Sequence, residues 1–501
     1  MIVSPRSEDL AAHLLRAKLF STEGFGIWNN WWYAGHNVPG YSVLFPPLGA
    51  WLTPQLVAAI SCPIAALMFE SLVYRRFGED AWLGALWFAV ATTTSLFTGR
   101  LTFAFGLMWA VGSALALQRR RPGLAAGLAA MTALASPVDA IFAALAGVAQ
   151  AAGAYHQERR LAPALPGIGV ILAAALPVLA LAVAFPEGGA EPFAFSALWP
   201  LVLISAAFVF ITPRRDAALR AGAAFYAIGC ILSFAVASPV GSNVTRLGPL
   251  LFGPVAALLW WPRRRVALVA VAVPLLYLQW QGPVRDVRTA EDNREVTTAY
   301  FQPLISYLSR QPGPPFRIEI PFTLFHWEAY VMAPRFPLAR GWERQLDTKY
   351  NSLFYDGKLT PARYEVWLHQ LAVRYVAVPD ADLDYSAKAE AALIDRGLPY
   401  LHLVDRTTHW RVYAVQDPTP IVQGPAVLRS LGPNWLQLEA ERVGTAFIAV
   451  HFSPYWAVTE GSGCIAPAGA FTRLEIRRPG PLRVAIRFSL TRISATSRRC
   501  S

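Results

Sequence analysis

An acid, an imidazole and a guanidinium occur at helical spacing near the N-terminus. Asp9, His13 and Arg16 occupy positions i, i+4 and i+7, so a helix would place them on one face, with leucines on the opposite face. These side-chain types transfer protons and bind anions in many proteins. The same stretch, with Ser7 before the acidic pair Glu8 and Asp9, also suits an ordinary solvated helix start. The spacing alone leaves both interpretations open.

Aromatic and amide side chains follow between residues 24 and 40. The candidate ligand contacts there are Trp28, Asn30, Trp32, Tyr33 and His36. Sugar rings stack on aromatic faces while their hydroxyls pair with amide groups, so the segment suits a sugar site. Trp and Tyr are also drawn to membrane-water interfaces, and an aromatic belt explains the segment equally well.

Isolated charges occur at the ends of long apolar runs further along the chain. Arg100 follows Thr98-Gly99, and Arg246 follows Asn243 by three residues. An arginine at the membrane-water boundary suits the phosphate of a polyprenyl lipid, although ordinary snorkelling towards headgroups is the alternative. An acid at the outer end of a span is a rarer placement, which makes Asp139 a secondary candidate.

The elements that must position these residues are apolar and membrane-spanning. The 501 residues have a mean hydropathy of +0.37 and only 15% charged residues, against about a quarter in soluble domains. About ten apolar runs lie between residues 49 and 280, most long enough to cross about 30 Å of hydrocarbon. We therefore predict an extracytoplasmic loop with an amphipathic helix over residues 1–48 and a transmembrane domain over 49–280.

Arginine clusters occupy every second loop between the apolar runs. They are Arg75-Arg76, Arg119-Arg120-Arg121, Arg159-Arg160, Arg214-Arg215 and Arg263-Arg264-Arg265. By the positive-inside rule these loops face the cytoplasm, which places both termini outside. Residues 1–48 contain no apolar run that could export them, so we expect a further apolar helix upstream. The high pI of about 9.7 reflects these clusters, and we exclude nucleic acid as a partner.

The polar remainder of the chain shows a strand pattern that changes with position. Short strands and amphipathic helices alternate over residues 281–420, which predicts an extracytoplasmic α/β region. From 421 to 501, strands separated by Gly and Pro turns predict a β-sandwich-like domain, as a structural cap or, by fold analogy, a sugar-binding module. The charged run Arg340–Asp347, with His326-Trp327-Glu328 before it, is a candidate for chemistry, and an ordinary salt-bridged surface is the favoured alternative.

Four cysteines and the absence of motifs limit the chemistry. Cys62 and Cys230 fall in apolar runs, while Cys464 and Cys500 share the outer side and could form a disulfide there. There is no CxxC or other metal spacing, no phosphate-binding glycine loop and no hydrolase motif. We predict no cofactor and no metal ligands, with dependence on a divalent metal left open. The Ala, Arg, Gly and Pro bias favours a bacterial source and hence a plasma-membrane location.

The layout resembles the GT-C superfamily of membrane glycosyltransferases, in particular bacterial members described as 6-pyruvoyl-tetrahydropterin-synthase-related membrane proteins. The pieces that carry the resemblance are EDLAAHLLRAKLF, WNNWWYAGHNVPGYSVLFPPL, FTGRLTFAFGL, ASPVDAIFA and GSNVTRLG, in this order over residues 8–246. The element SPYWAV at 453–458 resembles the β-rich tails of related proteins. Mycobacterial arabinofuranosyltransferases are similar at a greater distance.

The resemblance implies transfer of a sugar from a polyprenyl-phosphate donor to an extracytoplasmic glycan, lipid or protein, with inversion. The essential acid of the first extracytoplasmic loop maps onto Asp9, with Glu8 as alternate and His13 one turn away. Arg100 or Arg246 would neutralise the departing phosphate. The helix that precedes this acid in the family is absent here. The rival class is non-catalytic: a transporter, a flippase or a sugar-binding scaffold of the cell envelope.

The charge pattern generates a testable topology. Single cysteines at Arg120 and Arg214 should resist a membrane-impermeant thiol reagent in intact cells, because their loops face the cytoplasm. Single cysteines at Gly188 and Asp356 should react. The reverse pattern of labelling would contradict an outer location for the polar C-terminal region.

Overall fold

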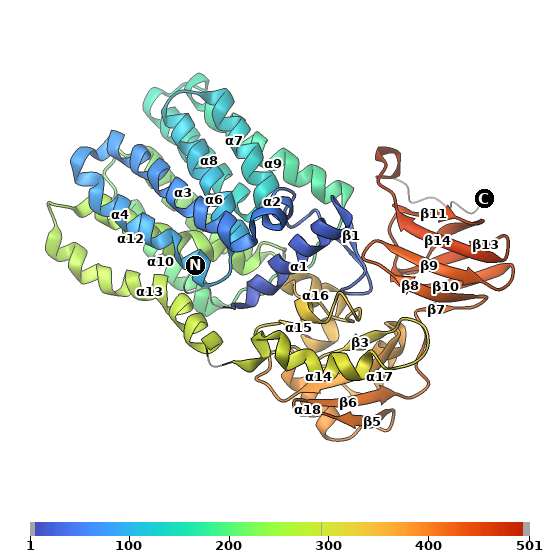
Figure 1. The fold of residues 1–501 in the computed structure, drawn as a ribbon. Helices are drawn as coiled ribbons and strands as arrows, with labels where there is room; N and C mark the ends of the chain where they lie inside the picture. Colours follow the sequence, from blue (N-terminus) through green and yellow to red (C-terminus); the bar gives the residue numbers. More distant parts are fainter. Residues whose placement is uncertain (1–5, 292, 494–501) are drawn as a thin grey trace. The chain divides into compact units, whose positions relative to one another are not determined.

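The computed structural model describes residues 6–291 and 293–493, and the chain divides into two compact units (Figure 1). Unit 1 comprises Met1–His13, Gly40–Val183 and Gly188–Glu291. Unit 2 comprises Leu14–Pro39, Ala184–Glu187 and Asp292–Ser501. Helix α1 (Glu8–Glu23) therefore begins in unit 1 and ends in unit 2.

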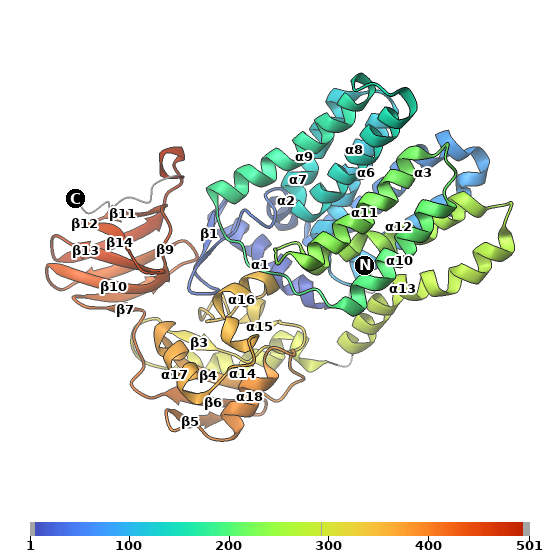
Figure 2. The same ribbon diagram turned by 180° about the vertical axis from the view of Figure 1, so that it is seen from behind.

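Unit 1 is built from helices. After α1 they are α2 (Phe45–Leu52), α3 (Pro54–Phe77), α4 (Trp82–Thr92), α5 (Thr94–Phe97), α6 (Leu101–Gln118), α7 (Pro122–Ala135), α8 (Pro137–Glu158), α9 (Leu165–Ala184), α10 (Phe195–Ile211), α11 (Ala217–Ala235), α12 (Leu247–Trp260) and α13 (Arg265–Glu291). Helix α3 packs on α6, α6 on α7, α11 on α8 and α10, and α4 on α12 (Figure 2). Prolines begin α3, α7 and α8, where a missing N–H leaves no hydrogen bond unmade.

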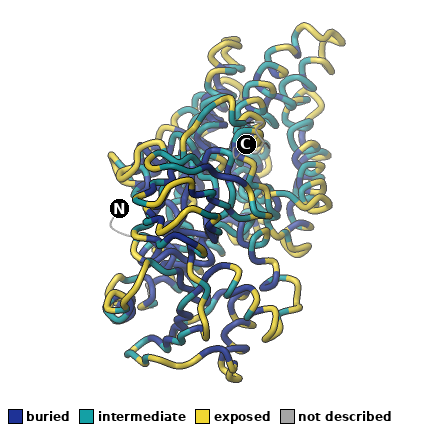
Figure 3. Tube along the Cα trace, turned by 90° about the vertical axis from the view of Figure 1, so that its right-hand side faces the viewer, coloured by how far each residue is buried: buried dark blue, intermediate teal, exposed yellow. Residues whose placement is uncertain are grey.

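Six helical stretches among the described residues are long and apolar enough to cross a membrane. They are Pro54–Phe97, Leu101–Gln118, Pro137–Glu158, Ala162–Ala184, Ala217–Ala235 and Arg265–Ala290. Two shorter apolar helices, α7 and α10, accompany them. Leu172, Leu176 and Leu179 of α9 are more than half exposed, as expected of side chains that face lipid. Exposed residues, drawn in yellow, occur along much of the Cα trace in Figure 3. By length and composition the chain is a multi-pass membrane protein.

Small residues let some of these helices approach closely. A Cβ atom on Gly253 of α12 would lie 2.2 Å from the ring of Trp87 on α4, and one on Gly84 would lie 2.6 Å from Leu258. Such positions let two helix backbones approach closely. Close packing matters between membrane helices, because their apolar surfaces gain little by leaving lipid. Gln279 of α13 adds hydrogen bonds, because it accepts from Trp87 Nε1 at 3.1 Å and donates to the carbonyl of Pro249 at 2.8 Å.

The first part of unit 2 is a mixed α/β region. Its sheet contains β3 (Arg317–Glu319), β4 (Val373–Pro379), β5 (Leu401–Arg406) and β6 (Trp410–Val415), in the order β3-β4-β6-β5. Strands β3 and β4 are parallel and the other pairs are antiparallel. The helices are α14 (Thr298–Leu308), α15 (Glu328–Val331), α16 (Arg344–Tyr350), α17 (Pro361–Gln370) and α18 (Lys388–Asp395).

The second part of unit 2 is made of two four-stranded antiparallel sheets. One has the order β12-β13-β10-β7 and the other β11-β14-β9-β8. The strands are β7 (Val422–Gln423), β8 (Ala426–Leu431), β9 (Trp435–Ala440), β10 (Gly444–His451), β11 (Trp456–Glu460), β12 (Gly463–Ala468), β13 (Phe471–Ile476) and β14 (Gly480–Ile486). Leu438 of one sheet and Leu474 of the other belong to a single apolar core, so the sheets form a sandwich. Cys500, the predicted disulfide partner of Cys464, lies outside the described residues.

Residues 28–39, here termed the tie segment, hold these two parts of unit 2 together. The segment folds as a hairpin of β1 (Trp28–Asn29) and β2 (His36–Asn37). Trp32 Nε1 donates to the carbonyl of Ala329 in the α/β region at 3.0 Å. Asn30 Nδ2 donates to the carbonyl of Gly432 in the sandwich at 3.0 Å. The same short segment therefore satisfies polar groups of both parts.

Close packing makes the tie segment sensitive to its neighbours. Trp32 is 1% exposed, and a Cβ on Gly341 would lie 2.3 Å from its ring. Trp28 meets Trp456 of β11 edge to face at 5.8 Å. Tyr33 and Ala34 have φ angles of 57° and 56°, a left-handed turn that the surrounding contacts must stabilise.

We expect Trp32→Ala to destabilise unit 2 by about 3–5 kcal/mol, because it empties a fully packed site and leaves the Ala329 carbonyl unpaired. Thermal unfolding and limited proteolysis of the full chain in detergent would measure the loss. The matched control is Phe25→Ala, which removes an aromatic ring that is 71% exposed in the same N-terminal stretch. Equal stability of the two variants would contradict the packing role of Trp32.

Candidate functional site

The first turn of α1 packs against the loop that leads into α6. Gly99 in this loop has a φ of +72°, and a Cβ there would lie 2.1 Å from Ser7 Oγ and 3.1 Å from the backbone nitrogen of Leu10. Only glycine combines this conformation with so close an approach. The contact brings the acidic residues Glu8 and Asp9 next to the loop that carries Arg100.

Arg100 occupies the end of this loop, directly before α6. Surrounding protein and the positive charge of Arg246 lower the pKa of its guanidinium, while Asp9, Asp286 and Glu8 act in the opposite direction. Because the side chain is exposed, water screens these effects and the guanidinium stays charged. A second arginine and three carboxylates of unit 1 thus lie within electrostatic range of Arg100. We call this group the charge cluster.

Arg246 is held in a defined orientation. It ends the short 3-10 helix η3 (Gly241–Arg246), and its guanidinium donates to the side-chain oxygen of Asn243. The guanidinium also lies 5.7 Å from the ring centre of Phe103 on α6. Tyr226 of α11 holds η3 in place, because its hydroxyl donates to the carbonyl of Val244 at 2.9 Å. Asn243 and Arg246, both expected from the sequence, therefore act as a pair.

Asp286 is a member of the charge cluster that the sequence analysis missed. It lies in the last turns of α13, and its carboxylate pairs with the exposed Arg285 at 3.1 Å. Helix α13 packs on α5, with the rings of Phe97 and Trp280 6.0 Å apart, and this contact carries Asp286 towards Arg100. The sequence feature that could have revealed Asp286 is its position shortly after the end of the last apolar run.

Asp139 is placed differently from the other acids. It is fully buried in the first turn of α8, and neither carboxyl oxygen has a hydrogen-bond partner among the described residues. Gly106 makes room for it, since a Cβ there would lie 2.4 Å from Asp139 Oδ2. Arg246 is within electrostatic range. Protein closes off the carboxyl of Asp139 in this conformation, and its role at the site stays a prediction.

The three polar side chains of α1 have different neighbours. His13 is buried and packs against the rings of Tyr41 and Phe45, with centroids 5.8 and 5.3 Å away. Arg16 pairs with Glu343 in unit 2. Asp9 lies within electrostatic range of Arg100, and a joint role of the three side chains stays a prediction.

The residues expected to contact a sugar are packed inside unit 2. Trp28, Asn30, Trp32, Tyr33 and His36 are each at most 3% exposed. Trp32 and His36 stack on each other, with centroids 5.9 Å apart and ring planes 10° apart. Burial lowers the pKa of His36 to about 4, so the ring is neutral at physiological pH. Their ring faces contact protein, and a sugar-binding role for them stays a prediction.

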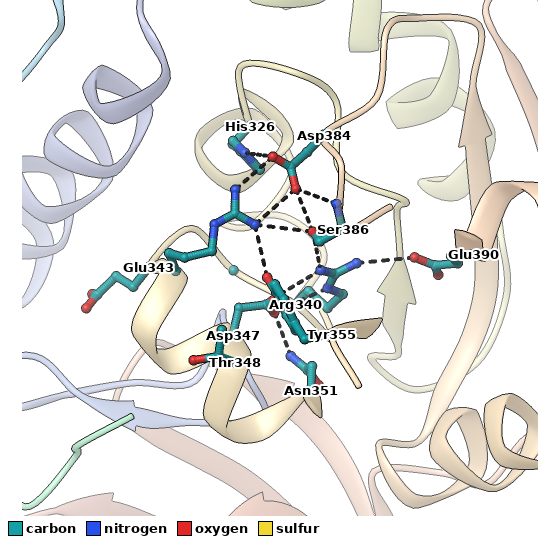
Figure 4. A network of polar contacts seen from close by, with 12 residues as sticks. His326, Arg340, Glu343, Asp347, Thr348, Asn351, Tyr355, Asp384, Ser386 and Glu390 are labelled. Atoms are coloured by element: carbon teal, nitrogen blue, oxygen red, sulfur yellow. Dashed lines mark hydrogen bonds and ion pairs between the residues drawn. The ribbon is translucent and has the colours of Figure 1, made fainter. Parts of the chain in front are cut away.

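The charged run near residue 340 is buried, whereas the sequence suggested a salt-bridged surface. Arg340 is 1% exposed and pairs with Asp347, whose carboxylate accepts from Nε at 3.2 Å and from Nη2 at 2.6 Å (Figure 4). It also contacts Glu390 at 3.3 Å. The rings of Phe322 and Phe354 lie 3.9 and 4.1 Å from its guanidinium carbon. The correction is physical: the partners that bury Arg340 come from distant parts of the chain.

A second arginine extends this network towards a histidine. Arg344 pairs with Asp384 at 2.7 Å, and Ser386 contacts both arginines at 3.0 to 3.2 Å (Figure 4). His326 lies 3.7 Å from Asp384 and stacks on Trp342 with centroids 3.5 Å apart. The network is closed off inside the α/β region, so we assign it a structural role.

Burial changes the protonation of several network members. It raises the pKa of Glu328 to about 8, against a hydrogen bond from Thr323 that acts in the other direction, and raises that of Glu390 to about 7. It lowers the pKa of His326 to about 4. Glu319 is buried with no hydrogen-bond partner for its carboxyl oxygens among the described residues, and burial raises its pKa as well. A neutral carboxylic acid suits such a site better than a carboxylate.

Comparisons with known proteins give a limited result. A scan against protein-family models finds no match, and a search of curated proteins finds none either. Solved structures similar to this chain include two of ArnT from Cupriavidus metallidurans. One, bound to undecaprenyl phosphate, has a TM-score of 0.37 at 15% identity, and the apo form has 0.40 at 13%. Both alignments cover 82% of this chain and 95% of the ArnT chain. These TM-scores are low, so the functional proposal below rests on this chain's own residues.

No group of three or more His, Cys, Asp or Glu side chains that could hold a metal ion occurs among the residues that the structure describes. The charge cluster is instead a mixture of guanidinium and carboxylate groups. Such a mixture can bind an anion and accept a proton at neighbouring positions.

The raised pKa of Glu328 predicts a pH dependence of stability. Its carboxyl takes up a proton more readily in the folded chain than in the unfolded chain, so its contribution is full below about pH 4.5 and is lost as pH rises through about 8. Between pH 6.5 and 8.5 we expect the folded state to lose on the order of 1–2 kcal/mol from this group.

Thermal unfolding across that pH range should show a falling midpoint for the wild type and a flatter profile for Glu328→Gln, which mimics the protonated acid. Glu441→Gln, at an exposed position of the sandwich, should keep the wild-type slope. Identical slopes in all three proteins would refute the assignment.

Proposed function

We propose that this protein is a membrane glycosyltransferase that moves a sugar from a polyprenyl-phosphate donor to an extracytoplasmic acceptor. The observation that supports it is the charge cluster, in which Asp9 and Asp286 accompany Arg100 and Arg246. Both arginines lie in loops that join apolar helices, where a lipid headgroup is accessible. The acceptor is a glycan or a lipid of the cell envelope, and the proposed location is the plasma membrane with unit 2 outside.

The proposed reaction divides the work between acids and arginines. Asp9 removes the proton from an acceptor hydroxyl as that oxygen attacks the anomeric carbon of the donor sugar. The bond from the anomeric carbon to the phosphate oxygen breaks, and its electron pair leaves with the polyprenyl phosphate. Arg100 and Arg246 balance the negative charge that develops there. Attack opposite the leaving group inverts the anomeric centre.

Placement of the residues supports these roles. Asp9 is half-buried in the first turn of α1, within electrostatic range of Arg100. Arg246 is pre-oriented by Asn243 and Phe103, so little side-chain entropy is lost when an anion binds. Glu8 precedes Asp9 and is the alternate base. A transporter needs no proton acceptor at Asp9, and this difference separates the two classes of function.

If Asp9 is the base, Asp9→Asn should lower sugar transfer by about two to four orders of magnitude with little change in stability. The assay is transfer of radiolabelled sugar from a polyprenyl-phosphate donor to membrane glycans at matched expression. Glu23→Gln, at the exposed C-terminal end of the same helix, is the control and should transfer normally. Wild-type transfer by Asp9→Asn would exclude Asp9 as base and leave Glu8 to be tested.

Arg100→Ala and Arg246→Ala should mainly weaken use of the donor, seen as a raised KM for the polyprenyl-phosphate sugar of about 10- to 100-fold. Arg120→Ala, in a loop of the opposite predicted side, should leave the KM unchanged. Donor use that is unaffected by either arginine would argue against the charge cluster as the phosphate site.

A further inference from the structure

Tyr455 of the sandwich contacts the last residue of the apolar helix α9. Ala184 is the last residue of α9 and of the candidate span Ala162–Ala184. Its carbonyl accepts a hydrogen bond from the hydroxyl of Tyr455 at 2.7 Å, and Tyr455 is 1% exposed. The next residue, Phe185, contacts the ring of Tyr455 with centroids 5.7 Å apart. Residues that contact Tyr455 are therefore separated from the last residue of this candidate span by the length of one tyrosine side chain.

The segment that follows β14 makes these contacts. The backbone nitrogen of Arg487 donates to the carbonyl of Tyr455 at 2.8 Å, and the guanidinium of Arg492 donates to the same oxygen at 3.3 Å. The ring of Phe488 lies 5.5 Å from that of Tyr455 and 5.8 Å from that of Phe185. Residues 487–492 are thus linked through Tyr455 and Phe488 to Ala184 and Phe185, the residues at the end of α9.

Arginines stand at both ends of this segment, and two apolar side chains between them are exposed. Phe488 is 52% exposed and Leu490 is 74% exposed, although Phe488 already packs on Phe185. Arg487 is exposed beside them. Exposed aromatic and aliphatic side chains flanked by arginines are typical of segments that rest in the headgroup layer of a bilayer.

The length of α9 matches the thickness of the hydrocarbon core of a bilayer. Helix α9 has 20 residues, which at 1.5 Å each gives about 30 Å, the thickness of the hydrocarbon core. Ala184 then marks the edge of the core, and the headgroup layer beyond it is roughly 5–8 Å deep. A tyrosine side chain is about as long as that layer is deep, so a segment tied to Ala184 through Tyr455 is within reach of the headgroups.

We propose that residues 487–492, here termed the docking segment, insert Phe488 and Leu490 into the bilayer surface and bind anionic lipid headgroups through Arg487 and Arg492. The charge of the sandwich fits this partner, because residues 421–493 contain eight arginines, no lysine and only four acidic residues. The apolar pair supplies insertion, and the arginines supply attraction to a negative surface. The docking segment fixes the sandwich to the membrane independently of any catalytic role of unit 1.

The test uses the full chain, with Cys62 and Cys230 replaced and the disulfide of Cys464 left intact, in vesicles of phosphatidylcholine with about 30% phosphatidylglycerol. A single cysteine at Leu490 carries an environment-sensitive fluorophore, and a single cysteine at Val443 is the control. Val443 is also apolar and is 58% exposed, in the turn between β9 and β10. Both positions are exposed, so labelling leaves the fold intact, which gel filtration and the unfolding midpoint verify.

We expect the probe at Leu490 to shift to shorter wavelength and to be quenched by lipid spin-labelled near the headgroup, while the probe at Val443 is unaffected. Arg487→Glu should lower the quenching at Leu490 about two- to fivefold in vesicles with phosphatidylglycerol and little in vesicles without it. A Leu490 probe that is as water-exposed as the Val443 probe would overturn the proposal. So would a Leu490 probe that is already shifted in detergent and is not quenched by lipid, because protein would then cover the segment.

Discussion

Charge is costly in hydrocarbon, and this constraint places the polar chemistry of unit 1. In the described part of unit 1 the charged side chains lie close to helix ends, in the loops and in the first or last turns, while the middles of the apolar helices carry almost none. The helix ends must then also provide any reactive groups. Gly99 is what makes the arrangement compact, because its lack of a side chain lets the first turn of α1 approach the loop of Arg100. A single methyl group there would separate the acid from the guanidinium.

The same constraint has a different solution in unit 2, where charges are buried in protein. Arg340 loses its water entirely, and the structure replaces that hydration with Asp347, Glu390, Ser386 and two aromatic faces. The carboxyl groups outnumber the guanidinium groups around it. Burial raises the pKa of Glu328 and Glu390, and protonation therefore reduces the excess negative charge. Such a network specifies one arrangement of β3, α16 and α18, because a lost partner leaves a buried charge uncompensated.

Secondary-structure elements could be predicted from the sequence better than the packing environment of individual side chains. The short strands expected over residues 281–420 are present as β3, β4, β5 and β6, because period-two patterns depend only on neighbouring residues. The fold class, an apolar helical region followed by an α/β region and β-sheets, was confirmed in the same way. The run Arg340–Asp347 was read as surface, because the residues that bury it, such as Asp384 and Glu390, come from elsewhere in the chain. His13 and Arg16 share a helix face with Asp9, yet periodicity carries no information about which partners each side chain meets.

The aromatic tie segment shows why composition alone could not decide between a ligand site and a core. Tryptophan and asparagine suit a sugar because they offer a flat apolar face beside a hydrogen-bonding group, and the same pair suits a junction between two parts of a fold. Trp28 Nε1 donates to Asn30 Oδ1 at 2.7 Å, and Asn30 in turn donates to Gly432. The amide that would serve a sugar hydroxyl is already used.

Under the proposed function, the balance of charge in the cluster matters more than any single member. Arginines alone would bind phosphate but would offer no group to take the acceptor proton. Carboxylates alone would repel the donor. With Arg100 and Arg246 beside Asp9, Asp286 and Glu8, the cluster can bind a phosphate and provide a base at neighbouring positions. As the sugar leaves, negative charge moves from the acceptor side to the phosphate, and fixed guanidinium groups meet that charge without reorganisation.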